Sequence, residues 1–165
     1  MIPGHIRSIV IDFINSEKYQ AALDVLEATC GTEPDDPEVL ATMGLLHFHL
    51  GSPDIWETYL FKSIEGSNVP FEVNWIWALI HTETGNPDMA IDFWQEVIDM
   101  GVDSYYFKGR DVEDAKSWIN DCRYMLSDMY YDLGKKHIAA MYKRAYLRNL
   151  EEGTATRCDP DMLRD

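Results

Sequence analysis

The sequence contains no apolar run of the roughly 18 to 20 residues that a helix needs to span a bilayer. Its first residues also lack the basic stretch, the apolar stretch and the small-residue cleavage site of an export signal. The cysteines are few, odd in number and far apart, which fits neither a disulfide framework nor a zinc site; they are Cys30, Cys122 and Cys158. We therefore expect a cytoplasmic protein that does not insert into membranes.

Basic residues are scarce, since the 165-residue chain has 14 Lys and Arg side chains against 29 Asp and Glu, a formal net charge of −15. Such a surface repels phosphate backbones and anionic lipids, so nucleic acid is not an expected partner. Residues 1–100 hold three basic and 17 acidic side chains, whereas residues 101–150 hold nine and seven. The basic face of the second stretch, with Lys143 and Arg144, is either solvated or a second surface for an acidic partner.

Motifs that carry catalytic chemistry are also missing. The sequence has no glycine-rich phosphate loop, no nucleophile elbow and no paired metal-ligand motif. His47 and His49 are two residues apart on a predicted helix, so their side chains point about 200° apart and cannot share one ion. We therefore expect no enzymatic activity, no metal and no cofactor.

An internal repeat with a period of 34 residues is present. Gly51-Ser52-Pro53-Asp54 recurs as Gly85-Asn86-Pro87-Asp88. A glycine can take the left-handed conformation that closes a helix, and Ser or Asn can cap the next one. Proline is accepted at the first helical position because the N–H there has no helical partner. The pattern predicts pairs of helices joined by tight turns.

The same register extends to positions that should face inward. Glu17 stands 34 residues before Gly51, in place of the turn glycine. Apolar and small residues align on the two helices of each pair, as a close helix crossing requires. The aligned columns are Ile9, Met43 and Trp77; Val10, Gly44 and Ala78; Ala22, Trp56 and Ala90; and Leu26, Leu60 and Trp94.

This combination of period and columns resembles the tetratricopeptide repeat (TPR) family. Three units cover residues 4–100, and residues 121–150, with a turn at Gly134, resemble a displaced fourth. The departures from the family pattern are Trp56, where a small residue is expected, and Glu17. The resemblance implies an all-α fold in which helix-turn-helix repeats stack into a right-handed superhelix, an α-solenoid.

The pattern predicts helices near 5–15, 19–30, 37–50, 53–65, 71–84, 87–99, 112–133 and 135–151. Together they would form one TPR-like domain over residues 1–151. Residues 152–165 would form a polar C-terminal tail, which we expect to fray because Asp159-Pro160 breaks any helix.

In the TPR family the first helix of each pair lines a concave groove that binds a peptide, and the resemblance assigns such a groove here. Its side chains combine aromatic and aliphatic groups with carboxylates, which selects basic or amphipathic protein segments. Apart from Arg7 and Asn15, the groove lacks the residues with which chaperone-tail receptors of the family clamp a terminal carboxylate. The expected partner-binding residues are Glu38, Leu45, Phe48, His49, Glu72, Trp75, Leu79, Glu83, Tyr124, Asp128, Tyr131 and Asp132, with Asp121 on the same face.

Residues 102–110 fall outside the repeat rhythm and carry three adjacent aromatic residues, Tyr105, Tyr106 and Phe107. Rings on a connecting segment either contact a partner or plug the end of the third unit's core. We treat these three, together with Lys143 and Arg144, as secondary contact candidates.

The predicted function is therefore a protein–protein interaction module, an adaptor or small chaperone that binds a basic or amphipathic protein segment in an acidic and aromatic groove. One alternative is an immunity or inhibitor protein that neutralises a basic toxin or enzyme domain. Another is a self-assembling scaffold: residues 6–14 are unusually apolar all round, which favours burial against another chain, as in a homodimer, or against the tail. Steep salt dependence would favour the inhibitor over the chaperone.

Overall fold

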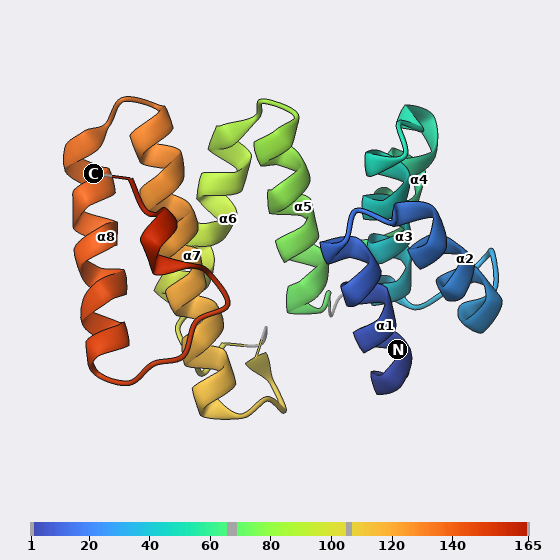
Figure 1. Ribbon diagram of the computed structural model, residues 1–165, viewed down its shortest axis with the longest axis horizontal. Helices are drawn as coiled ribbons and strands as arrows, with labels where there is room; N and C mark the ends of the chain where they lie inside the picture. Colours follow the sequence, from blue (N-terminus) through green and yellow to red (C-terminus); the bar gives the residue numbers. More distant parts are fainter. Residues whose placement is uncertain (1, 66–68, 105–106, 165) are drawn as a thin grey trace. The chain divides into compact units, whose positions relative to one another are not determined.

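A computed structural model describes residues 2–65, 69–104 and 107–164. Regular structure within these residues is helical, which confirms the all-α prediction (Figure 1). Every predicted helix is present, with ends within two residues of the expected ones. The helices are α1 (Gly4–Asn15), α2 (Tyr19–Cys30), α3 (Pro37–His49), α4 (Pro53–Ser63), α5 (Phe71–Glu83), α6 (Pro87–Met100), α7 (Val112–Asp132), α8 (Lys136–Glu151) and the short 3-10 helix η2 (Pro160–Met162).

The chain divides into two compact units, residues 1–80 and residues 81–165, with the boundary inside α5. Each unit is described by itself. None of the helices in the described ranges is both long and apolar enough to cross a membrane.

The turns between paired helices keep the predicted 34-residue register. Glu17, Gly51 and Gly85 all have positive φ angles, of 57°, 72° and 79°. Glu17 therefore takes the backbone conformation that the repeat demands even though it is not a glycine. Gly134, in the displaced fourth pair, has a φ of 73°. The repeat is thus visible in the backbone as well as in the sequence.

The capping prediction is only half right. Ser52 and Asn86 do stand at the N-cap positions of α4 and α6, but neither side chain makes a capping hydrogen bond. Their ψ angles of 75° and 61° differ from the extended backbone of Asp36, whose ψ is 123°. Asp36 does cap α3, since its carboxylate accepts from the backbone N–H groups of Glu38 and Val39.

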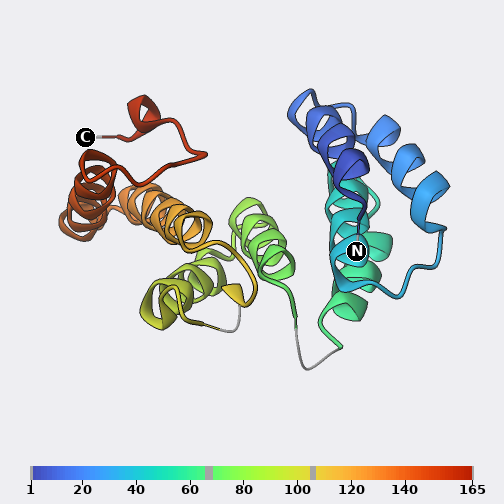
Figure 2. The same ribbon diagram turned by 90° about the horizontal axis from the view of Figure 1, so that it is seen from below.

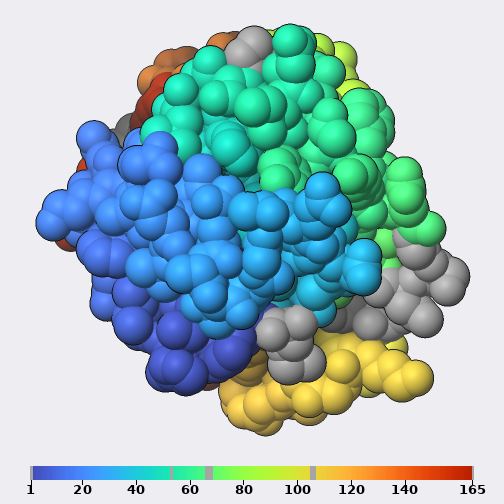
Figure 3. Space-filling model, turned by 90° about the vertical axis from the view of Figure 1, so that its right-hand side faces the viewer, coloured from blue at the N-terminus to red at the C-terminus, as the bar shows by residue number. Residues whose placement is uncertain are grey.

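Unit 1 is built from two helix hairpins, α1 with α2 and α3 with α4, and from the first part of α5. The predicted inward columns supply its core, because Val10, Ala22, Leu26, Met43 and Leu60 are at most 2% exposed. Figure 3 shows α2 and the segment that follows it, in blue, on the surface of this unit. Ile9 is an exception at 41% exposed, because α1 packs through Val10, Phe13 and Ile14 instead.

The crossing of α3 and α4 depends on Gly44. A Cβ atom at this position would lie 2.9 Å from Cγ of Leu60 and 3.3 Å from the backbone oxygen of Trp56. Distances this short leave no room for a side chain, so the small-residue column of the repeat has a direct steric cause.

Unit 2 is centred on α7, which packs against both α6 and α8 (Figure 2). The largest fully buried side chains of this unit are Trp94, Leu126 and Tyr146. Trp94 occupies the column that Leu26 and Leu60 occupy in unit 1, as the repeat register predicts.

The C-terminal tail is ordered against α7 and α8, so the expectation that it frays is wrong (Figure 1). The hydroxyl of Tyr146 lies 3.0 Å from Oγ1 of Thr156, and the Leu163 side chain is buried. The tail sequence is polar, but its polar groups pair with those of α7, which offsets the loss of chain entropy.

Candidate functional site: an acidic and aromatic face of α7

The predicted groove residues of the last unit lie on one face of α7. Positions seven apart on a helix share a face, so Asp114, Asp121 and Asp128 form an acidic ridge along it. Tyr124 and Tyr131 follow the same spacing beside the ridge. We call the face formed by Asp114, Ser117, Trp118, Asp121, Tyr124, Asp128, Tyr131 and Asp132 the α7 face.

Arg157 of the tail occupies the first half of the α7 face. Its guanidinium forms ion pairs with Asp114 and, at 3.4 Å, with Oδ2 of Asp121, and it donates to Oγ of Ser117 at 2.8 Å. The guanidinium carbon lies 3.9 Å from the centroid of the Trp118 ring. A planar guanidinium can stack on an indole ring while it pairs with carboxylates, which a lysine ammonium cannot do. Such a site therefore distinguishes arginine from lysine.

Asp121 is the most buried carboxylate of the face, with 1% of its side chain exposed. Its oxygens accept from Oγ1 of Thr156 at 2.6 Å and from the backbone N–H of Arg157 at 3.3 Å. Burial raises the pKa of Asp121, and the hydrogen bonds and the charge of Arg157 oppose that rise without cancelling it. The tail therefore supplies the partners that this buried acid requires.

Arg164 occupies the second half of the α7 face. Its Nε lies 3.1 Å from Oδ1 of Asp128, and its guanidinium also pairs with Asp132. The guanidinium carbon lies 5.7 Å from the centroid of the Tyr131 ring. Burial raises the pKa of Asp128, the charge of Arg164 lowers it, and the charge of Asp132 adds to the rise.

The spacing of the two arginines matches that of the acidic groups. Asp114 and Asp121 lie on average 12.5 residues before Asp128 and Asp132, which is roughly 19 Å along a helix. Seven residues of fully extended chain reach about 23 Å, and the turn of η2 shortens this span. A segment with two guanidinium groups seven residues apart and a turn such as η2 between them therefore fits the α7 face.

Sequence reasoning missed three residues of the face, Asp114, Ser117 and Trp118. The seven-residue spacing of Asp114, Asp121 and Asp128 was available as a signal, because it extends the predicted face by two turns. Of the predicted residues, Tyr124 packs edge-on against Tyr146, with ring centroids 5.5 Å apart.

In unit 1 the predicted groove residues of α3 mostly serve internal packing. Glu38 forms an ion pair with Arg7 at 2.7 Å, and Leu45 is buried at 8% exposed, so Leu45 lines the core rather than a surface. Phe48 packs edge-on against the Trp56 ring. His49 stacks on Tyr19, with ring centroids 4.4 Å apart.

The predicted residues of α5 include no fully buried side chain. Glu72, Trp75 and Leu79 are half-buried, and Glu83 is exposed. The pKa of Glu38 is raised mainly by burial. The charge of Arg7 lowers this pKa, and the charge of Glu72 raises it further. Glu38 and Glu72 are thus electrostatic neighbours within unit 1.

The secondary contact candidates separate into three groups. Tyr105 and Tyr106 lie outside the described residues. Phe107 is 3% exposed, so its ring packs in the interior and offers no contact surface. This is the packing role that was one of the two alternatives for the segment. Arg144 is exposed, whereas Lys143 donates to the backbone oxygen of Arg164 at 3.1 Å and so holds the tail.

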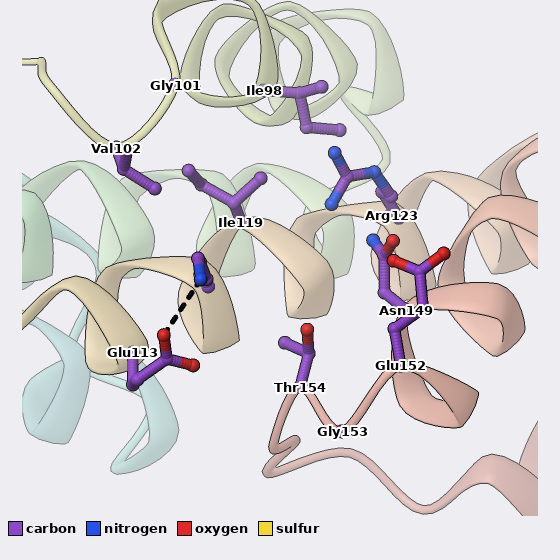
Figure 4. A pocket seen from close by; sticks show the side chains of 11 residues that line it. Ile98, Gly101, Val102, Glu113, Ile119, Arg123, Asn149, Glu152, Gly153 and Thr154 are labelled. Carbon is purple, nitrogen blue, oxygen red and sulfur yellow. Dashed lines mark hydrogen bonds and ion pairs between the residues drawn. The ribbon is translucent and has the colours of Figure 1, made fainter.

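A cavity of about 390 Å³ lies on the opposite side of α7 (Figure 4). Ile98 and Ile119 form apolar parts of its wall, and Arg123 and Asn149 project toward it. Burial lowers the pKa of Arg123. Arg123 is two residues from Asp121, about 200° around the helix, so this cavity is separate from the α7 face.

Among the described residues, no group of three or more His, Cys, Asp or Glu side chains could hold a metal ion. His47 stacks on Tyr59 with ring centroids 5.4 Å apart, and burial lowers its pKa. Burial also raises the pKa of the Cys122 thiol well above its ordinary value and that of Cys158 to about 12. Both thiols are therefore protonated at neutral pH.

Comparison of the chain with models of known protein families finds no match, and neither does comparison with curated proteins.

Proposed function

We propose that this chain is a non-catalytic protein-interaction module of TPR-like build, which binds a basic protein segment on an acidic and aromatic surface. The observation that carries the proposal is the occupancy of the α7 face by two arginines, Arg157 and Arg164. Each guanidinium forms ion pairs with two carboxylates. That of Arg157 stacks on Trp118, and that of Arg164 has its carbon 5.7 Å from the centroid of the Tyr131 ring.

The chemistry of the face explains why arginine is the preferred group. A carboxylate accepts two N–H donors of a planar guanidinium, and an aromatic ring attracts its delocalised charge. A lysine ammonium would use the carboxylates but would match neither the fork geometry nor the stacking. The face therefore favours arginine-bearing segments over segments that are merely positive.

The TPR-like superhelix is part of the proposal, and two features support it. The turn residues Glu17, Gly51 and Gly85 repeat their backbone conformation at a 34-residue interval. Gly44 allows the close crossing of α3 and α4 that the family pattern requires. In such an array α7 is the first helix of the fourth pair, and first helices carry the binding residues.

An inhibitor of a basic protein domain is the second candidate, and the net charge of −15 favours it. Long-range attraction speeds the encounter of oppositely charged proteins and weakens as salt screens it. An adaptor or chaperone that binds a short segment would show a smaller salt effect, because fewer charges contribute.

The test compares partners captured by the wild-type chain and by an Asp128→Asn, Asp132→Asn variant. The control variant, Asp92→Asn with Asp99→Asn, removes two exposed charges from α6 and leaves the α7 face intact. The proposal predicts a partner that the control retains and the α7 variant loses. A partner that all three proteins retain equally, or whose binding segment has no basic residue, would contradict it.

A further inference from the structure

The two halves of the tail are attached to α7 in different ways. The inner half, residues 154–158, is fixed through buried groups, since Thr156 and Arg157 satisfy the Asp121 carboxylate and Thr156 pairs with the buried Tyr146. The outer half, residues 159–164, is mostly exposed, and Met162 is 69% exposed. We call the outer half the latch.

The latch is held at three points that resemble the contacts of a bound peptide. The Leu163 side chain is 8% exposed. The Arg164 guanidinium lies between Asp128 and Asp132, beside the Tyr131 ring. Lys143 of α8 donates to the backbone oxygens of residues 163 and 164, at 3.5 and 3.1 Å. These contacts recognise one apolar side chain, one guanidinium and the main chain between them.

We infer that the surface formed by Asp128, Tyr131, Asp132 and Lys143, the latch site, binds protein segments with an apolar residue directly before an arginine. The latch then acts as an internal competitor that such a partner segment displaces. This inference rests on the proposed function. It specifies which partner segment binds and how the latch regulates that binding.

The exposure of the latch contacts makes displacement feasible. The Arg164 side chain is 47% exposed and that of Asp132 is 57% exposed, and ion pairs in contact with water are weak. The latch competes because its covalent attachment gives it a high effective concentration at the site. A partner that makes the same contacts and adds others of its own can replace it, while the inner half of the tail keeps Asp121 paired.

The experiment measures binding of a fluorescently labelled peptide with the sequence of residues 159–165 by anisotropy. The proteins are the wild-type chain and a Leu163→Ala, Arg164→Ala variant, whose latch has lost its two side-chain contacts. The latch covers the site in the wild type, so the apparent affinity there is the intrinsic affinity multiplied by the fraction of time that the site is open. The variant should therefore bind roughly tenfold more tightly. Adding Asp128→Asn and Asp132→Asn should remove that gain. Met162→Ala, a change at an exposed position of the latch, should bind as the wild type does.

Equal affinity of the wild type and the latch variant would overturn the competition, and no binding to a folded latch variant would overturn the site. If the wild type forms a dimer that the peptide dissociates, the occupant of the site is the tail of a second copy. That result would also overturn the internal competition. The tryptophan fluorescence of the chain, to which Trp118 contributes, should be unchanged in the latch variant, because Trp118 contacts Arg157 of the inner half.

A second measurement covers the case in which the latch variant fails to fold. Asp132→Asn alone, at an exposed position, should speed hydrogen exchange at the amides of Met162 and Leu163, which donate to the backbone oxygens of Asp159 and Pro160. Unchanged exchange would contradict the inference. If peptide binding fails but the Asp128→Asn, Asp132→Asn variant loses its captured partner, the inference fails and the proposed function stands.

Discussion

Arg157 stacks on Trp118, with its guanidinium carbon 3.9 Å from the ring centroid, while the same group reaches the buried carboxylate of Asp121. One tail residue thus contacts both an aromatic ring and a carboxylate on neighbouring turns of α7. The same contacts of Arg157 order the tail and show that the α7 face binds a guanidinium group.

Arg157→Ala should lower the free energy of unfolding by about 1–3 kcal/mol, because the Asp121 carboxylate loses a charged partner while it stays buried. Urea unfolding followed by circular dichroism measures this change. Arg148→Ala is the matched control, since the Arg148 side chain is 70% exposed and lies 4.0 Å from Glu152; its effect should stay below about 0.5 kcal/mol. Equal effects of the two changes would show that Arg157 is only a surface residue.

The Cys158 thiol should react slowly with iodoacetamide at pH 8, because burial and the nearby Asp121 charge raise its pKa to about 12. The reactive thiolate increases as pH approaches the pKa from below, so the rate should rise about tenfold per pH unit. Asp121→Asn removes one cause of the shift and should speed the reaction at pH 8. Mass spectrometry of the modified peptide gives the rate at Cys158 alone.

Asp161→Asn is the control for that experiment, since Asp161 is exposed and lies on the same tail. It should leave the rate unchanged. A rate at Cys158 that levels off between pH 9 and pH 10, as it does for a thiol of ordinary pKa, would contradict the raised pKa.

Gly44→Ala should destabilise unit 1 by about 1–3 kcal/mol, because the added methyl group would overlap Leu60 at the crossing of α3 and α4. Gly4→Ala is the control: Gly4 begins α1, and no atom would lie within 4 Å of its new Cβ. That change should be neutral or slightly stabilising, as alanine is in helices. Thermal unfolding of both variants decides whether the crossing has space to adjust.

Glu17→Gly should stabilise the chain by about 0.5–1 kcal/mol, because Glu17 has a φ of 57°, which is unfavourable for a residue with a Cβ atom. Gly85→Ala is the reciprocal change, at the equivalent turn with a φ of 79° and with open space around the new methyl group. It should destabilise by a similar amount. Opposite signs in thermal unfolding would support the shared turn conformation, and a loss of stability in Glu17→Gly would contradict it.

The helices could be predicted because their ends are marked locally. Pro37, Pro53 and Pro87 stand at first helical positions, and positive-φ residues close the turns of each pair, so each boundary depends on neighbouring residues alone. The inward columns followed from the 34-residue period.

The contacts of the tail could not be predicted in the same way. Arg157 and Arg164 pair with residues that are 32 to 43 positions away in sequence, and a polar segment with a proline is also typical of a frayed end. The burial of Leu45 was missed because helix spacing fixes which face a residue occupies, but not what covers that face. Leu45 belongs to a buried cluster that also contains Leu60 of α4 and Val73 and Ile76 of α5.

The central claim, that the α7 face prefers arginine, is tested most directly by a peptide titration. The Leu163→Ala, Arg164→Ala protein is titrated with two peptides of the sequence 159–165, one natural and one with glutamine in place of the arginine. We predict that the natural peptide binds at least about tenfold more tightly, and that the difference in affinity shrinks between about 50 mM and about 300 mM NaCl. Equal binding of the two peptides would contradict the claim that this surface recognises a guanidinium group.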